Sequence, residues 1–258
     1  MILFSTMFLY EYSLEEIAKA VELSGCDGVE FWVETPDFWV DRRIERLYEI
    51  REYIGAIHGA IFDLNPCSIN QHVVEATVKE NLFAVNVASK LGRVLTIHAG
   101  KRSAAREPVD EDHEALQKYF RILKKYGRIK NATILLENSE PLVNYLCKDY
   151  EEVVEYAKKF GFGITLDVNH ALKNGDLWNY IESLDLVKNV HVSSYDEKGR
   201  HTTARNDERI KRFLRELKEI GYNGLITIEL DDLSYGEMTY EDKVRELKKE
   251  REFLEKFI

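Results

Sequence analysis

Cysteine is scarce in this chain, which has three among its 258 residues: Cys26, Cys67 and Cys147. They are widely spaced and odd in number, and no two of them form a Cys-x-x-Cys pair. Neither a disulfide framework nor a thiolate zinc site is therefore indicated. We expect a protein of a reducing compartment, the cytoplasm.

Long apolar runs are also missing. No stretch approaches the roughly 20 residues that cross a bilayer, so we expect no membrane partner. The opening segment, MILFSTMFLYEYS, has neither a positively charged start nor a cleavage site of small residues. We interpret it as the first strand of the fold and not as a signal peptide.

Positive charge is in deficit, because 36 Lys and Arg face 46 Asp and Glu and the net charge is -10. A dedicated nucleic-acid module is usually basic, so DNA is the less favoured partner, although a local basic patch can lie on an acidic protein. Hydrophobic residues make up 45% and charged residues 32% of the chain. This composition predicts a sizeable core in a solvated shell and argues against disorder.

Short apolar runs alternate with longer amphipathic stretches along the whole sequence. Each run is rich in Ile, Val, Leu or Phe and is short enough to be a buried strand. The runs cover residues 2–7, 28–32, 54–58, 94–98, 133–137, 163–167, 190–193 and 225–229.

Helical patterns fill the intervals between these runs. Ser13 followed by Glu16 predicts a helix that starts with a capping box, and Asp149 is a suitable N-cap for the next residues. Apolar residues recur at helical spacing, with charged residues on the other face. These patterns cover residues 73–91, 150–160, 210–220 and 240–257.

The alternation continues through eight strand–helix units with no Ser- or Pro-rich linker and no break in composition. It predicts an α/β fold with a parallel sheet and helices outside. Eight units in a chain of this length favour a single (β/α)8 TIM barrel, one domain over residues 1–258. The alternative is an open doubly wound sheet, which is disfavoured because residues 8–11 hold no glycine for a phosphate loop.

Metal-binding side chains fall at the ends of six predicted strands. They are His58, His98, Glu137, Asp167 with His170 three residues further on, His191 and Glu229. In a barrel these strand ends share one rim, where the catalytic residues of this fold lie. Imidazole and carboxylate suit Zn²⁺ or Mn²⁺, with Mg²⁺ as a further option, and a mixed ring leaves room for water or substrate. We therefore predict an enzyme with one or two divalent metal ions.

Each candidate also has an ordinary role when it is taken alone. A histidine after a strand is often a hydrogen-bonded loop residue, and Asp167 could cap the next turn. Six such residues at six strand ends outweigh these alternatives, because burying the carboxylates without a cation would be costly. We interpret His72 and His113 as surface residues. Trp32, in an aromatic cluster after the second run, is a candidate for a substrate pocket wall, with core packing as the alternative.

Taken in order, these motifs resemble the xylose isomerase-like TIM barrel superfamily, which contains the endonuclease IV family and many sugar isomerases and epimerases. The matching segments are IHGAIFDLNPCS, VLTIHAG, ILLEN, TLDVNHA, NVHVSSYD and ITIEL. The resemblance implies one metal bound by Glu137, Asp167, His191 and Glu229. In epimerase-like members Glu137 and Glu229 would also act as proton acceptor and donor, and we expect His170 to orient the substrate.

The endonuclease IV-like members imply a larger metal cluster. In them His58 and His98 would join Glu137 at a second zinc, and His170 and His201 would join an aspartate at a third.

This chain departs from the nuclease pattern at that third zinc. Gly199 stands where the pattern has the aspartate, and Ser194 replaces another aspartate after the strand of His191. Asp196 is the carboxylate that could compensate. The departures argue against a complete nuclease cluster.

Two predicted rim loops are locally basic. They contain Lys101, Arg102 and Arg106, and Lys198, Arg200 and Arg205. Solvated loops are the ordinary interpretation. The functional interpretation is that Lys101, Arg102, Arg200 and Arg205 bind an anionic substrate, which would be a sugar phosphate or a DNA backbone.

Three functions are consistent with the sequence. The first is a metal-dependent sugar or sugar-phosphate isomerase or epimerase that transfers a proton through a metal-stabilised enediolate. The second is a zinc phosphodiesterase acting on abasic DNA, which the pair His58 and His98 favours and Gly199 opposes. The third is a non-catalytic, metal-stabilised barrel. We prefer the first. The sugar, the native metal and the oligomeric state are left open.

Overall fold

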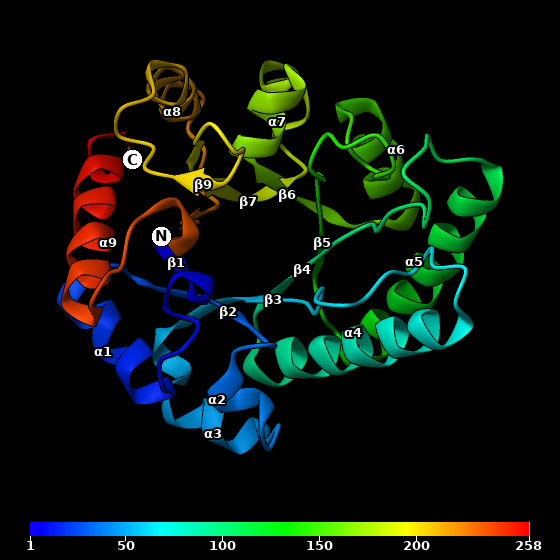
Figure 1. The fold of residues 1–258 in the computed structure, drawn as a ribbon, viewed down its shortest axis with the longest axis horizontal. Coiled ribbons are helices and arrows are strands. Elements are labelled where there is room, and N and C mark those ends of the chain that lie inside the picture. Colours follow the sequence, from blue (N-terminus) through cyan, green and yellow to red (C-terminus); the bar gives the residue numbers. More distant parts are fainter. Residues whose placement is uncertain (258) are drawn as a thin grey trace. The chain divides into compact units, whose positions relative to one another are not determined.

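The computed structural model of the chain describes residues 1–257. Eight parallel strands form a closed barrel in the order β1-β10-β7-β6-β5-β4-β3-β2 (Figure 1). The barrel strands are β1 (Ile2–Ser5), β2 (Gly28–Trp32), β3 (Ile54–His58), β4 (Val94–Ile97), β5 (Ile134–Glu137), β6 (Gly163–Asp167), β7 (Val187–Val192) and β10 (Leu225–Ile228). The short antiparallel strands β8 (Ser194–Tyr195) and β9 (His201–Thr202) form a second sheet. The predicted (β/α)8 TIM barrel is confirmed.

Contacts divide the chain into two compact units. The first unit comprises residues 1–55 and 189–258, and the second comprises residues 56–188. The assignment of one domain to the whole chain stays a prediction. Among residues 1–257, none of the helices has both the length and the apolar character needed to cross a bilayer.

The first unit brings together the two ends of the sequence. Its helices are α1 (Leu14–Ser24), α2 (Pro36–Trp39), α3 (Ile44–Glu49), α8 (Glu208–Ile220) and α9 (Tyr240–Leu254), with 3-10 turns η1 (Thr6–Leu9), η2 (Arg51–Tyr53), η4 (Asp232–Ser234) and η5 (Glu255–Phe257). Helices α1 and α9 pack side by side, blue and red in Figure 1. Helix α1 begins at the predicted capping box of Ser13 and Glu16 and ends at Gly25, whose φ of 76° suits glycine.

In the interior of the first unit, a leucine side chain packs closely against two glycines. Leu3 of β1 is completely buried. A Cβ built on Gly55 would lie 2.5 Å from Leu3 Cδ2, and one built on Gly28 would lie 3.3 Å from the same atom. The two glycines therefore leave the space that the Leu3 side chain fills.

The second unit contains four α-helices among the residues that the structure describes. They are α4 (Gln71–Leu91), α5 (Asp110–Lys130), α6 (Tyr150–Phe160) and α7 (Val168–Asn174), followed by the 3-10 segment η3 (Leu177–Ser183). Helices α4 and α5 lie side by side in Figure 1. Phe120 of α5 contacts Tyr156, Phe160 and Phe162 edge-on, with ring centroids 5.3 to 5.7 Å apart. These aromatic contacts join α5 to α6 and to the start of β6.

All three cysteines are free and buried. Burial raises the pKa of Cys26 to about 11 and the pKa of Cys67 to about 12. Burial also raises the pKa of Cys147 well above its usual value. These thiols are therefore inert side chains of the core at neutral pH.

Candidate metal centre and active site

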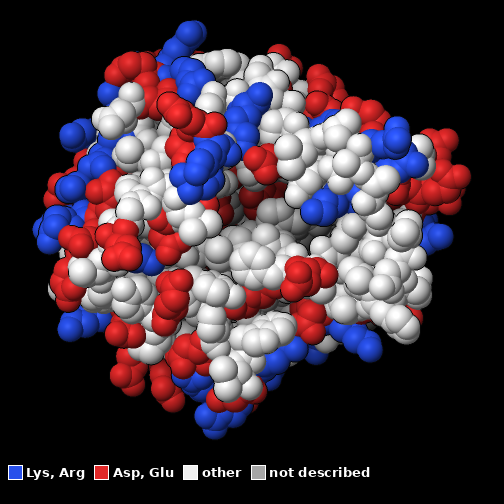
Figure 2. Space-filling view, viewed as in Figure 1, with Lys and Arg blue, Asp and Glu red and all other residues white. Residues whose placement is uncertain are grey.

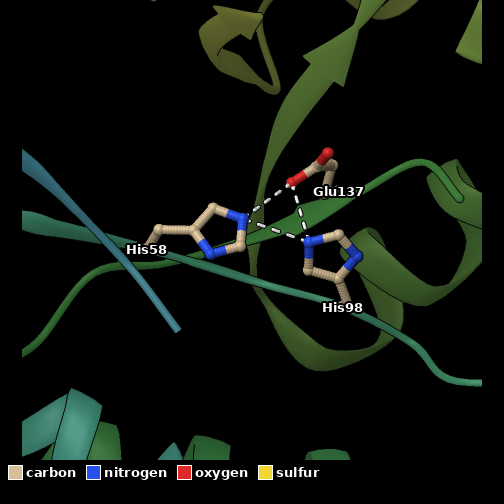
Figure 3. Close-up of side chains that lie close together, drawn as sticks. All are labelled: His58, His98 and Glu137. Carbon is tan, nitrogen blue, oxygen red and sulfur yellow. Dashed lines mark hydrogen bonds and ion pairs between the residues drawn. The ribbon is translucent and has the colours of Figure 1, made fainter. Parts of the chain in front are cut away.

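Three predicted ligands lie together in the second unit (Figure 3). His58 ends β3, Glu137 ends β5, and His98 follows β4 directly. Nε2 of His98 is 3.1 Å from Nε2 of His58, and Glu137 Oε2 is 3.5 Å from the His58 nitrogen and 3.2 Å from the His98 nitrogen. His58 and Glu137 are buried, whereas His98 is partly exposed. Two imidazoles and a carboxylate thus converge, and the group is accessible to solvent at His98.

A backbone carbonyl fixes the orientation of the His58 ring. Nδ1 of His58 lies 2.9 Å from the carbonyl oxygen of Gly59. A carbonyl only accepts hydrogen bonds, so Nδ1 carries the proton and the neutral ring has its lone pair at Nε2. This lone pair is on the nitrogen that faces His98 and Glu137, as metal binding requires.

The spacing of these three donor atoms fits a divalent cation. Ligands at zinc distances in a tetrahedral arrangement lie about 3.3–3.6 Å apart. The separations between the donor atoms of His58, His98 and Glu137 are 3.1 to 3.5 Å. Imidazole and carboxylate are also ligands that zinc and manganese accept. The residues present therefore fit a metal ion.

Asp167 and His170 stand at the junction of β6 and α7, where Asn138 supports both. Oδ1 of Asp167 caps α7 by accepting a hydrogen bond of 2.8 Å from the backbone nitrogen of His170. The side chain of Asn138 binds the backbone nitrogen and oxygen of Asp167 at 2.7 and 3.0 Å. Nδ1 of His170 lies 2.9 Å from the backbone oxygen of Asn138. Asp167 is therefore a helix cap, and because the cap uses Oδ1 it is compatible with metal binding through Oδ2.

In the first unit, Glu229 lies beside two imidazoles. Its Oε2 is 2.8 Å from Nδ1 of His191 and 3.8 Å from Nδ1 of His201. The hydroxyl of Ser193 is 2.9 Å from the same His201 nitrogen. Both His191 and Glu229 are buried. Two predicted ligands of this unit, His191 in β7 and Glu229 directly after β10, are thus adjacent. His201 of β9 lies further from the Glu229 carboxylate than His191 does.

Glu30 of β2 is a buried carboxylate that the sequence reasoning missed. It is completely inaccessible to solvent, and its Oε2 lies 2.8 Å from Nε2 of His191. The sequence does contain a signal, because a glutamate interrupts the apolar run GVEFW.

The basic residues predicted in the second unit have partners within the protein. Arg102 donates to the backbone oxygen of Glu107 at 2.6 Å and lies 3.7 Å from the carboxylate of Asp112. The Lys101 ammonium lies 5.3 Å from the centre of the Tyr145 ring. Binding of substrate by Lys101 and Arg102 stays a prediction.

The basic residues of the first unit are also paired. Arg200 donates two hydrogen bonds, of 2.8 and 2.6 Å, to Asp196 and with backbone donors lowers the pKa of that carboxyl to about 2. Arg205 forms ion pairs with Glu246 and Glu250 of α9. Asp196, the candidate replacement for the missing aspartate, is thus already engaged by Arg200. Substrate binding by Arg200 and Arg205 stays a prediction.

Three further sequence interpretations concern packing. Trp32 is buried, and its role in a substrate pocket wall stays a prediction. His72 is exposed, as interpreted. His113 is only partly exposed, because α5 packs on α6 and brings its Nδ1 to 3.1 Å from the hydroxyl of Tyr156 and 3.4 Å from Glu152. His113 is thus a surface residue, with its side chain 35% exposed, that also has partners on α6.

Comparison with known proteins relates this architecture to a family. The family model described as the xylose isomerase-like TIM barrel matches residues 17–257. The uncharacterized protein MJ1188 of Methanocaldococcus jannaschii is 34% identical to this chain, and the match covers 98% of each.

Solved structures resemble the chain over nearly its whole length. The crystal structure of a D-tagatose 3-epimerase-like protein is 25% identical with a TM-score of 0.73, covering 99% of this chain and 97% of the other. The structure of an L-ribulose 3-epimerase has a TM-score of 0.78 and covers 98% of this chain and 93% of the other. Its identity is 17%, so this second likeness is one of fold. The match to the family model settles the membership that the motifs suggested: the chain belongs to the xylose isomerase-like TIM barrel family.

Proposed function

We propose that the chain is a divalent-metal-dependent isomerase or epimerase of a ketose sugar or sugar phosphate. The observation that carries this proposal is a pair of buried carboxylates, Glu137 at the end of β5 and Glu229 directly after β10, each beside imidazole nitrogens. The similarity to a D-tagatose 3-epimerase-like protein supports the choice of substrate class. Zinc or manganese suits these ligands, and magnesium is a further option.

The residues that would hold the metal are Glu137, Asp167, His191 and Glu229. They stand at or beside the ends of β5, β6, β7 and β10, which are neighbours in the strand order. When bound, the metal would supply a positive charge that stabilises the negative charge developing on the substrate oxygen.

Proton transfer is the task of the two glutamates. One carboxylate removes the proton from the carbon next to the substrate carbonyl, and the electron pair of that bond moves toward the carbonyl oxygen to give an enediolate. The other glutamate, in its acid form, returns a proton to carbon, which changes the configuration there or moves the carbonyl. The Nδ1–H of His170 donates to the backbone carbonyl of Asn138, so the other ring nitrogen, Nε2, would accept a hydrogen bond from a substrate hydroxyl.

The group of His58, His98 and Glu137 supports a second candidate, a zinc phosphodiesterase acting on abasic DNA. A one-metal epimerase does not require this group, whereas a two-zinc enzyme does. Charge argues against it. On the face drawn in Figure 2, Lys and Arg are interspersed with Asp and Glu and form no continuous basic surface such as DNA binding favours. We therefore keep the epimerase as the first proposal.

Deuterium exchange tests the proposal directly. The protein would be freed of metal with a chelator, loaded in turn with Zn²⁺, Mn²⁺ or Mg²⁺, and incubated in D₂O with ketoses and ketose phosphates. We expect deuterium at the carbon next to the carbonyl of one sugar class, with a new epimer or isomer, as read by NMR. The chelated protein is the control. Cleavage of an abasic duplex, with no exchange into any sugar, would favour the phosphodiesterase.

A further inference from the structure

Three polar groups of the first unit surround one oxygen of Glu30. Oε2 of Glu30 accepts hydrogen bonds from Nδ2 of Asn189 at 2.7 Å and from Oγ1 of Thr227 at 3.0 Å, and it lies 2.8 Å from Nε2 of His191. All four residues are buried, and Glu30, Asn189 and Thr227 have no accessible surface. The cluster is thus a closed polar network within the interior.

Strand pairing explains how this network assembles. Strands β7 and β10 pair in parallel, with Leu225 opposite Asn189 and Thr227 opposite His191. Asn189 and His191 are two residues apart, so their side chains point to the same face of the strand. Glu30 comes from β2, which is separated from β10 by β1 in the strand order. A long carboxylate side chain spans this distance and joins the two groups of strands.

Fold stability alone does not explain a carboxylate in this position. Taking a carboxylate out of water costs several kcal/mol, and apolar side chains of similar volume often serve stability as well or better. The run GVEFW is apolar on both sides of Glu30. A buried charge kept at such a place indicates a task that an apolar residue cannot perform.

We propose that Glu30 is the positioning residue for His191, holding it in the orientation and proton arrangement of a metal ligand. Oε2 of Glu30 accepts from Asn189 and Thr227, and as the same acceptor toward the ring it assigns the ring proton to Nε2 of His191. The opposite nitrogen, Nδ1, is then directed at Glu229, whose Oε2 is 2.8 Å away. Metal-binding histidines commonly donate their other ring N–H to a carboxylate in this way. The inference rests on the proposed function, because the metal is the one proposed for the rim.

The first test compares two isosteric substitutions of buried glutamates. Glu30→Gln removes the charge beside His191, and Glu250→Gln is the matched control, because Glu250 is equally buried but binds Thr203, Ala204 and Arg205 instead. Zn²⁺ affinity would be measured by competition with a chromophoric chelator. We expect Glu30→Gln to weaken affinity about 10–100-fold and the control to leave it unchanged. Equal affinity in wild type and Glu30→Gln would overturn the inference while leaving the proposed function standing.

The second test needs no substitution of Glu30 and no metal. Long-range ¹H–¹⁵N spectra of the apo protein report which ring nitrogen of His191 carries a proton, with His191→Asn used to assign the signals. We expect a slowly exchanging proton on Nε2, and faster exchange of that proton in Glu30→Gln but not in Glu250→Gln. A wild-type ring with an unprotonated Nε2 would refute the role of Glu30. This readout decides the inference even if Glu30→Gln does not fold or the wild type binds no metal.

Discussion

Individual hydrogen bonds determine which atom each candidate ligand presents. Nδ1 of His58 is bound by the carbonyl of Gly59, Nδ1 of His170 by the carbonyl of Asn138, and Nε2 of His191 by Glu30. In each case the bond fixes the ring proton on one nitrogen and makes the other nitrogen the acceptor of the ring. The candidate site therefore requires the hydrogen-bonding groups that orient the imidazole rings as well as the candidate ligands. Substitutions can test both kinds of residue.

Replacing Glu229 with glutamine should abolish turnover and leave the barrel folded. An amide cannot exchange the proton that the mechanism assigns to this carboxyl, and loss of a general acid or base costs typically 10²–10⁴-fold in rate. Stability should change little, because rim residues of this fold contribute little to it. The measurement is kcat on the sugar found by deuterium exchange, with circular dichroism as the folding control. The same outcome is expected for Glu137→Gln. Near-wild-type kcat in Glu229→Gln would remove the proposed proton role.

Sequence patterns predicted the candidate ligands but not the residues that hydrogen-bond to them. His58, Glu137 and Asp167 could be predicted because each ends an apolar run, and the ends of parallel strands share one rim. Glu30 was missed, because it lies in the middle of a strand and not at its end, although the glutamate that interrupts GVEFW is a signal in the sequence. Its partner Asn189 is 159 residues away in the sequence. Only the strand order brings such residues together.

At the level of elements, strands were predicted more accurately than helices. Strands β2, β3 and β6 have the predicted bounds, and in β3 and β6 the buried apolar run ends abruptly at a polar residue, His58 and Asp167. The bounds of helix α5 (Asp110–Lys130) were not predicted from the sequence. The short helices α2 and α3 were also missed. They have few residues and no side-chain cap, so their formation depends on packing.

The start of helix α8 provides a prediction about pH. Its N-cap, Asp207, accepts hydrogen bonds from the backbone and guanidinium of Arg209 and from the hydroxyl of Ser194. Burial alone would raise the pKa of Asp207, but these bonds outweigh it and lower the pKa to about 2. This value is below the unfolded value of about 3.9, so the carboxylate adds stability above pH ~4 that is lost as the pH falls toward ~2.

Asp207→Asn removes the charge and keeps a good N-cap. We expect the free energy of unfolding of the wild type to exceed that of this variant at pH 7, with the difference shrinking below pH ~4. Urea unfolding at pH 7, 4 and 3 would measure it. Asp207→Ala, which also loses the cap, should cost about 1 kcal/mol more. A difference between wild type and Asp207→Asn that is constant with pH would contradict the prediction.

The contact between β1 and Gly55 predicts a packing defect. In Gly55→Ala the new methyl group would lie 2.5 Å from Leu3 Cδ2, so the core must shift. Overpacking of this kind costs typically about 1–3 kcal/mol. Gly236→Ala is the control, because a Cβ there meets no atom within 4 Å. Thermal unfolding should show a lower Tm for Gly55→Ala only, and Leu3→Ala should lower the Tm less in the Gly55→Ala chain than in the wild type. Equal Tm values for both alanine variants would argue against the contact.

For the whole molecule, the test is metal content and its effect on stability. We expect one or two tightly bound ions and not three, because Gly199 stands where a third zinc would need an aspartate and Asp196 is engaged by Arg200. Elemental analysis after loading with excess zinc gives the number of bound ions per chain. Anomalous diffraction at the zinc edge gives the positions of these ions. Three fully occupied sites would move the preference to the phosphodiesterase.

Metal binding should also raise the Tm of the protein. A ligand at 100 times its Kd stabilises the folded state by about 2.7 kcal/mol. For a chain of this size that corresponds to a rise in Tm of roughly 5–10 °C. Differential scanning calorimetry with and without a chelator measures it, and Glu229→Gln should show a smaller rise. A Tm that is the same with and without metal would mean that the ligands do not act together.

Because its native cysteines are buried, this protein is suited to site-specific labelling at introduced cysteines. Cys26, Cys67 and Cys147 are all buried with raised pKa values, so thiol reagents at neutral pH should leave the native protein unmodified and modify it fully once it is unfolded. A cysteine introduced at the exposed position of Val40 in the first unit, and another at Ile69 in the second, would then be the only reactive thiols. Spin labels on that pair would measure the distance between the two units directly, with and without metal.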